Sequence, residues 1–177
     1  KQTMGAGFDD EGDTNANPTL MNVTMYLMLP VFIALQCVLA YQIYNGMAGV
    51  ELLGAVLSSG IFAGIGIIYG HELAHTKGFS FLIARWMMAL SGSSHFCYAH
   101  VYNHHLELGC ENDPATAPRG RSLYAHLPKS YFGQSKFLYT MEKQRLKRLG
   151  VPFLSWQNRW IRGYAMSLPT IALFWFA

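Results

Sequence analysis

Apolar residues in this sequence are gathered into long runs that contain no charged side chain. The first run covers residues 23–44, and the second covers residues 52–70. At about 1.5 Å per residue, a helix of either length reaches across most or all of the roughly 30 Å hydrocarbon core of a bilayer. The pattern therefore predicts two membrane-spanning helices, joined by the short link at residues 45–50.

Two further apolar stretches follow. Residues 79–98 form one of them, interrupted by Arg85, and residues 164–177 form the other, which is still apolar at its last residue. Because the chain also begins at Lys1 rather than Met, we expect it to be part of a longer protein. We therefore expect a loop over residues 1–22, followed by a membrane domain over residues 23–177 that is truncated at both ends.

The composition favours a membrane protein over a soluble one. Hydrophobic residues make up 51% of the chain, charged residues only 13%, and the mean hydropathy is +0.16. Buried helices of a large soluble protein are the less favoured alternative, because two long uncharged runs follow each other so closely. The three cysteines have neither metal-type spacing nor the even number of a disulfide framework.

The distribution of positive charge predicts the orientation. Eleven of the 13 Lys and Arg residues lie between His71 and Trp160, and the link at residues 45–50 has none. Cytoplasmic loops carry the excess of positive charge, so the histidine-bearing side is expected in the cytoplasm. Two crossings return the chain to its starting side, so the acidic N-terminal stretch FDDEGDTNANP is expected in the cytoplasm as well. The net charge of +3 is modest and gives no support for nucleic-acid binding.

Five histidines are spaced as metal ligands. If the second span continues as a helix past Gly70, His71 and His75 lie one turn apart on one face, and His100 and His104 repeat this spacing, with His105 about 100° round the helix. All-imidazole ligation suits zinc, copper, iron or nickel. Five ligands exceed the three or four that one zinc ion takes, which favours a two-metal site. His95 and His126 are expected to orient ligands or to lie at the interface.

The main alternative to a two-metal site, judged from the residues alone, is a zinc protease. The segment HELAH satisfies HExxH, in which His71 and His75 would bind zinc and Glu72 would act as the general base. That interpretation leaves HVYNHH, residues 100–105, without a role. A non-catalytic metal carrier lined by histidines is a second alternative.

HELAH followed by HVYNHH resembles the first two histidine boxes of the membrane-bound non-haem di-iron hydroxylases and desaturases. The following sequence, with ENDPATAP at residues 111–118, is similar to that of the alkane and xylene monooxygenases. Ala99 stands where the alkane enzymes usually carry a glutamate, and the xylene-type enzymes are more similar there.

The resemblance implies a fold class and an activity. The fold would be an all-α integral membrane helical bundle, fatty acid desaturase-like, in a bacterial inner membrane. Two iron ions would be bound by the five ligands His71, His75, His100, His104 and His105, while Glu72 would orient a ligand. The reaction would use O2 and electrons from a rubredoxin or ferredoxin to hydroxylate the terminal methyl group of an apolar hydrocarbon, an alkane or alkyl-aromatic. A fatty acyl desaturase is the near alternative. The family's third histidine box would follow residue 177, so the chain alone is expected to be inactive.

Four glycines of the second span form two small-xxx-small pairs. Gly60 and Gly64 form the first pair and lie on nearly the same face of the helix as His71 and His75. Because these positions have no side chains, they predict a slot through which substrate reaches the metals. Close helix packing is the alternative for this pair and for the second. Gly66 and Gly70 form the second pair.

Residues 134–150 predict an amphipathic helix on the cytoplasmic side. It would lie on membrane lipid headgroups, and Lys143 and Arg145 would attract an acidic electron donor. The segment containing Glu111 and Asp113 is expected to be a loop, and a role of these two carboxylates in bracing the site is the less favoured alternative.

Overall fold

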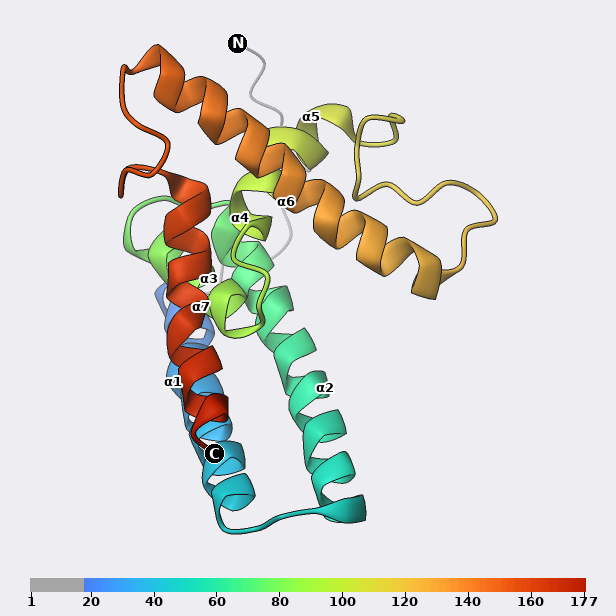
Figure 1. Ribbon diagram of the computed structural model, residues 1–177, viewed down its shortest axis with the longest axis vertical. Helices are drawn as coiled ribbons and strands as arrows, with labels where there is room; N and C mark the ends of the chain where they lie inside the picture. The colour runs from blue at the N-terminus through green and yellow to red at the C-terminus, as the bar shows by residue number, and fades with distance from the viewer. Residues whose placement is uncertain (1–17) are drawn as a thin grey trace.

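The computed structural model describes residues 18–177, and in this range it consists of helices and loops without a strand. Three helices run along the long axis of the molecule (Figure 1): α1 (Pro18–Tyr44), α2 (Gly49–Ala74) and α7 (Arg159–Trp175). The shorter α3 (Phe79–Leu90) packs against all three. Another long helix, α6 (Leu123–Arg148), lies across one end of the bundle. Short helical pieces join α3 to this end: α4 (Phe96–Ala99), η1 (His100–His104) and α5 (His105–Glu107). This confirms the predicted all-α helical class.

The two predicted spans are observed as a helical hairpin. Helices α1 and α2 are both long and apolar enough to cross a membrane. Helix α1 begins at Pro18, so the predicted loop over residues 1–22 was too long at its C-terminal end; proline suits the first helical position because the N–H it lacks would have no helical partner there. Residues 8–17, the rest of the acidic N-terminal stretch, lie outside the described range.

Much of the apolar surface of α2 is exposed. The exposed side chains are large and uncharged: Val50, Leu53, Val56, Leu57, Ile61, Phe62, Ile65 and Ile68. A continuous apolar face of this kind is unfavourable in water and favourable against lipid or further apolar helices. The hairpin therefore has the surface of a membrane-embedded element.

Close packing of α2 against α1 and α3 depends on Gly66 and Gly70. A Cβ atom at Gly66 would lie 3.3 Å from the ring of Phe32 in α1, and one at Gly70 would lie 3.0 Å from Cε of Met88 in α3. Both contacts leave almost no room for a side chain. The predicted role of this glycine pair in close helix packing is confirmed.

The third apolar stretch, residues 79–98, does not form a full span. Helix α3 ends at Leu90, and its 12 residues extend for about 18 Å, well short of a bilayer core. Helix α7 begins at Arg159, before the predicted apolar stretch, because the side chain of Asn158 accepts hydrogen bonds from the N–H groups of Trp160 and Ile161 and caps the helix.

The buried core lies at the end of the bundle where α2, α3 and α4 meet. Its fully buried side chains include Leu73, Met87, Met88 and Cys97. Leu73 lies between the two histidines of α2 in sequence, so the helical turn that carries them is held by packing on its opposite side. The core thus gives the histidines a rigid base.

Helix α6 is longer than predicted. It begins at Leu123, eleven residues before the predicted start at 134, and Ser122 caps its first turn by accepting a hydrogen bond from the N–H of Ala125. At the other end, Gly150 adopts a φ of 67°, and the N–H groups of Gly150 and Val151 bond to the carbonyls of Lys147 and Leu146. This is the Schellman pattern of a helix C-terminus, so the predicted stop at Gly150 is confirmed.

Candidate metal centre

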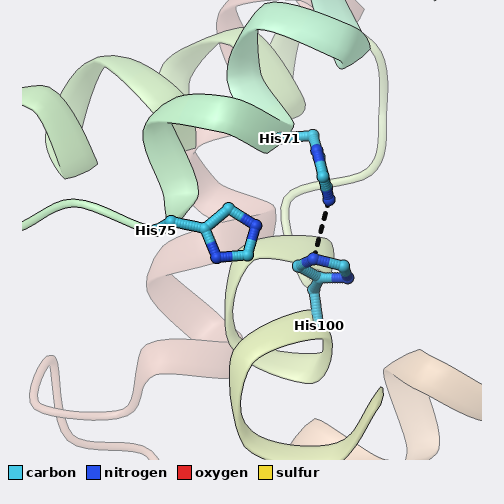
Figure 2. Close-up of side chains that lie close together, drawn as sticks. All are labelled: His71, His75 and His100. Carbon is cyan, nitrogen blue, oxygen red and sulfur yellow. Dashed lines mark hydrogen bonds between the residues drawn. The ribbon is translucent and has the colours of Figure 1, made fainter. Parts of the chain in front are cut away.

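Helix α2 supplies the first two histidines of the centre. It continues past Gly70 as predicted and ends at Ala74, with His75 still in the α-helical region of backbone conformation. The ring centroids of His71 and His75 are therefore only 5.0 Å apart. Figure 2 shows both rings on the side of α2 that faces the histidine of the next segment.

The second histidine group lies on a π-helix, which the sequence reasoning did not foresee. Residues 100–104 form η1, and the N–H of His105 donates to the carbonyl of His100, five residues earlier. In a π-turn, residues five apart come into line. His105 was expected about 100° round an α-helix from the face shared by His100 and His104, free to reach a second ion or to close the same one. The assumed α-helix was wrong, and Nε2 of His105 lies 2.9 Å from Nε2 of His100.

The two groups meet at the buried ring of His100. Its Nε2 lies 2.8 Å from Nε2 of His71 (Figure 2). It also lies 2.9 Å from Nε2 of His105. Ligand atoms of His71, His75 and His100 all lie within 4.8 Å of one another. Two imidazole nitrogens bound at right angles to one ion at about 2.1 Å would be separated by about 3.0 Å. The donor set and its spacing therefore fit a metal ion of the imidazole-binding class.

The electrostatics of the cluster favour uncharged rings. Burial, together with the neighbouring imidazoles of His71 and His105, lowers the pKa of His100 to about 3. The ring is consequently neutral at pH 7 and has a lone pair to offer, which is the form of histidine that binds a metal.

His104 lies at the edge of this cluster. Its ring is stacked on that of His100, with centroids 5.2 Å apart, and its Nδ1 lies 2.7 Å from Oδ2 of Asp113. Burial raises the pKa of the Asp113 carboxyl, but hydrogen bonds from Thr116, the N–H of Ala115 and His104 outweigh burial and hold the pKa below its usual range. Asp113 was expected in a loop, with a role in bracing the site as the less favoured alternative; its contact with His104 could not be read from a spacing of nine residues.

Other predicted participants lie outside the cluster. His95 is buried against the rings of Tyr131 and Tyr164, and His126 lies 3.2 Å from the carbonyl oxygen of Ala115. Glu72 is on α2 between the two cluster histidines and is exposed. The ligand-orienting roles suggested for Glu72 and His95 stay predictions.

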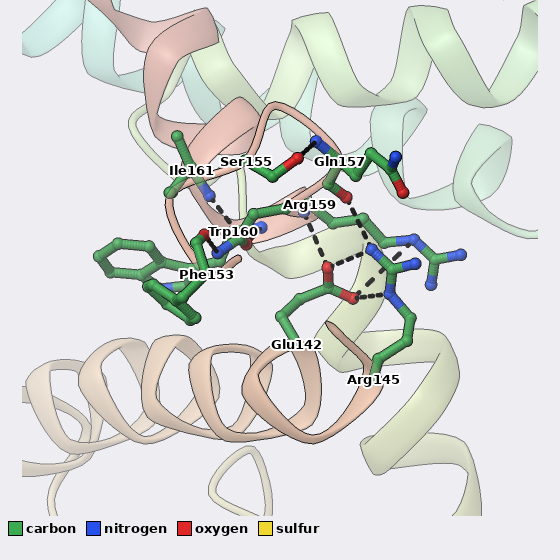
Figure 3. Close-up of polar contacts among 9 residues, drawn as sticks. Glu142, Arg145, Phe153, Ser155, Gln157, Arg159, Trp160 and Ile161 are labelled. Atoms are coloured by element: carbon green, nitrogen blue, oxygen red, sulfur yellow. Dashed lines mark hydrogen bonds and ion pairs between the residues drawn. The ribbon is translucent and has the colours of Figure 1, made fainter. Parts of the chain in front are cut away.

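The two basic residues predicted for donor docking have different environments. Arg145 makes a two-pronged contact with the carboxylate of Glu142, at 2.8 and 2.7 Å, and also donates to the carbonyl of Gln157 (Figure 3). Lys143 is exposed. Arg145 thus has a structural contact that the docking hypothesis did not include, whereas Lys143 is accessible to a partner.

Glu142 was missed by the sequence reasoning. Its side chain is fully buried and also accepts a hydrogen bond from the N–H of Arg159, at the start of α7. Leu138, Glu142 and Leu146 recur every four residues and are all buried, so the helical periodicity was the available signal. The carboxylate joins α6 to α7.

The glycines of the predicted substrate slot are exposed. A Cβ atom at Gly60 or Gly64 would have no neighbour within 4 Å among the residues that the structure describes. Close packing within this chain therefore does not explain this pair, and its role as a substrate path stays a prediction.

Comparison with known proteins places these features in a family. The fatty acid desaturase family matches residues 48–177, which include all five histidines. The chain is 34% identical to alkane 1-monooxygenase 1 of Alcanivorax borkumensis over 77% of its own length and 34% of that protein. It is 36% identical to alkane 1-monooxygenase 2 of Pseudomonas aeruginosa, over 65% of its length and 31% of that protein.

The similarity extends to an enzyme of aromatic substrates. The xylene/toluene monooxygenase hydroxylase component of Pseudomonas putida is 28% identical over 76% of this chain and 38% of that protein. The chain thus spans about a third of the length of the curated relatives it matches. On its helical fold, its histidine cluster and a match over most of its length, the chain belongs to the fatty acid desaturase family.

Proposed function

We propose that this chain is part of a membrane monooxygenase that hydroxylates the terminal methyl group of an alkane or alkyl-aromatic hydrocarbon. The observation that carries the proposal is the convergence of His71, His100 and His105. Nε2 of His100 lies 2.8 Å from Nε2 of His71 and 2.9 Å from Nε2 of His105. The names of the relatives support a hydrocarbon substrate. The alternative of a zinc protease needs only HELAH and does not account for His100 and His105 at the same point.

The metal would be iron, with two ions per site. The proposed ligands are His71, His75, His100, His104 and His105. Each offers an imidazole nitrogen, which binds a metal when the ring is neutral. When bound, iron would supply the reaction of O2 with an unactivated C–H bond. The protein would hold the rings in place through the core around Leu73 and would keep water from the site by burial of His100.

Substrate and electrons would arrive from different sides. An apolar hydrocarbon would enter from the bilayer along Gly60 and Gly64 of α2, whose surroundings are apolar. Electrons would come from a rubredoxin- or ferredoxin-type protein on the cytoplasmic side, attracted by exposed basic residues such as Lys143. The proposed location is the bacterial inner membrane, and the charge distribution supports an orientation with the histidines facing the cytoplasm.

Metal analysis tests the proposal. The polypeptide that carries this sequence should be purified in detergent and its iron and zinc measured per chain. About two irons, falling on His104→Ala substitution, would support the di-iron monooxygenase; a single tightly bound zinc would contradict it. Products formed under O2 then separate the two iron chemistries, because a 1-alkanol from an n-alkane indicates hydroxylation and a new double bond in a fatty acyl chain indicates desaturation.

A further inference from the structure

Asp113 has a fully buried side chain whose hydrogen-bond partners are all donors. Its Oδ1 accepts from the N–H of Ala115 at 2.9 Å, and its Oδ2 accepts from the hydroxyl of Thr116 at 2.5 Å. The remaining contact of Oδ2 is with Nδ1 of His104, at 2.7 Å. An ionised carboxylate has no proton to give, so this contact requires the histidine to donate.

The direction of the Thr116 hydroxyl is set by a further bond. Its Oγ1 accepts the N–H of Gly109 at 3.0 Å, and its own proton therefore points to Asp113. This arrangement keeps Oδ2 an acceptor. The proton of the neutral His104 ring must then reside on Nδ1, and the lone pair is left on Nε2.

We propose that Asp113 is the positioning residue of His104: it holds the ring in the Nδ1–H tautomer and presents Nε2 as the metal-binding atom. The inference deepens the proposed function and rests on it, since it assumes that His104 is a metal ligand. A ligand histidine whose second nitrogen donates to a carboxylate is held in one orientation and is more basic toward the ion.

The loop that carries Asp113 is itself held against α6. Pro114 packs so closely on Gly133 that a Cβ atom there would lie 2.5 Å from Cβ of Pro114. Next to it, Nε2 of His126 lies 3.2 Å from the carbonyl oxygen of Ala115. Helix α6 therefore holds the carboxylate in place from outside the histidine cluster.

An isosteric substitution can reverse the tautomer without removing the turn. In Asp113→Asn the amide oxygen would keep accepting from Ala115, so the amide nitrogen would face both Thr116 and His104. Thr116 can accept one of its protons, and Nδ1 of His104 would have to accept the other, which moves the ring proton to Nε2. Asp113→Ala removes the constraint instead and leaves the ring free to adopt either tautomer.

The two variants should therefore rank in opposite orders for two properties. Metal affinity should fall from wild type to Asp113→Ala to Asp113→Asn, whereas thermal stability should fall from wild type to Asp113→Asn to Asp113→Ala. A residue that only stabilised the loop would give the same order for both properties. The exposed Glu111, two residues earlier in the same loop, gives a matched control as Glu111→Gln.

The measurement is competition for Fe²⁺ against a chromophoric chelator, on the polypeptide that carries this sequence, with unfolding followed in the same detergent. We expect Asp113→Asn to bind about 10- to 100-fold more weakly than wild type, and Glu111→Gln to bind as wild type. Equal affinity of wild type and Asp113→Asn, or weaker binding by Asp113→Ala than by Asp113→Asn, would overturn the inference.

The same titration with Zn²⁺ separates the inference from the proposed function. If wild type binds zinc and not iron, the proposed function fails, while the order of the two Asp113 variants for zinc still decides the role of Asp113. If wild type binds neither metal, both fail.

Discussion

The Nε2 atoms of His100 and His105 lie 2.9 Å apart because the backbone between them makes a π-turn. A regular α-helix would place these two rings about 140° apart around its axis, and only one of them could face His71. The extra residue in the turn lets both rings reach the same point. The insertion of a π-turn within a histidine box is thus what assembles the cluster from two helices.

His105 should accordingly matter for metal binding as much as His100. Replacing His105 by Ala removes one of the two Nε2 contacts of the buried ring, and we expect iron per chain to fall by at least half. The control is Leu106→Ala, the next residue, which is 75% exposed. Metal analysis of both variants checks this; full iron content in His105→Ala would show that the close contact does not reflect shared ligation.

Glu142→Gln should destabilise the fold without changing the metal site. The substitution leaves Arg145 and the N–H of Arg159 without their buried carboxylate, and breaking a pair of this kind costs about 3 kcal/mol of unfolding free energy. Lys143→Gln, one residue away and exposed, should change it by less than about 0.5 kcal/mol. Denaturant unfolding in detergent measures both.

The contribution of Glu142 should also depend on pH in a defined direction. Burial raises its pKa, but the bonds from Arg145 and the N–H of Arg159 outweigh burial and lower the pKa below the ordinary value. A carboxyl whose folded pKa is depressed stabilises the protein above its unfolded pKa of about 4.3, and this stabilisation is lost as pH falls through the folded pKa. The difference between wild type and Glu142→Gln should persist from neutral pH to about 5 and shrink below about 4. A difference that did not change with pH would argue against an ionised Glu142.

Gly70 and Gly64 should respond differently to the same substitution. Gly70→Leu forces a side chain against Met87 and Met88 and should cost about 1 to 3 kcal/mol of stability. Gly64→Leu meets no described neighbour and should fold as wild type. If the substrate path runs along α2, however, Gly64→Leu should block part of that path, and the longest n-alkane that is hydroxylated should become shorter. Product analysis over a series of chain lengths checks this, and an unchanged limit would count against the path.

Electron delivery should depend on salt through Lys143. Attraction of an acidic donor protein is screened within about 10 Å at 0.1 M ionic strength, so turnover should fall as salt is added. Lys143→Gln should lower turnover at low salt and should match wild type at high salt. Arg145→Gln is expected to lower stability as well, because its guanidinium is bound to Glu142. Turnover that is independent of salt would exclude this docking mode.

Features that depend on local spacing could be predicted from the amino-acid sequence. The two uncharged runs became α1 and α2, and His71 and His75 share a face of α2, because helical periodicity places residues four apart together whatever surrounds them. Gly150 ended α6 for an equally local reason, since it adopts a positive φ that other residues avoid.

The contacts on which the chemistry depends were settled by the packing of distant segments. The π-turn over His100–His104 departs from the α-helical spacing on which the prediction was based, and the short helix α4 that leads into it packs against α6. Asp113 meets His104, and Glu142 meets Arg159, across loops whose path cannot be read from composition. These partners are set by burial: a buried carboxylate must be matched by donors, and which donors are within reach depends on how distant segments pack.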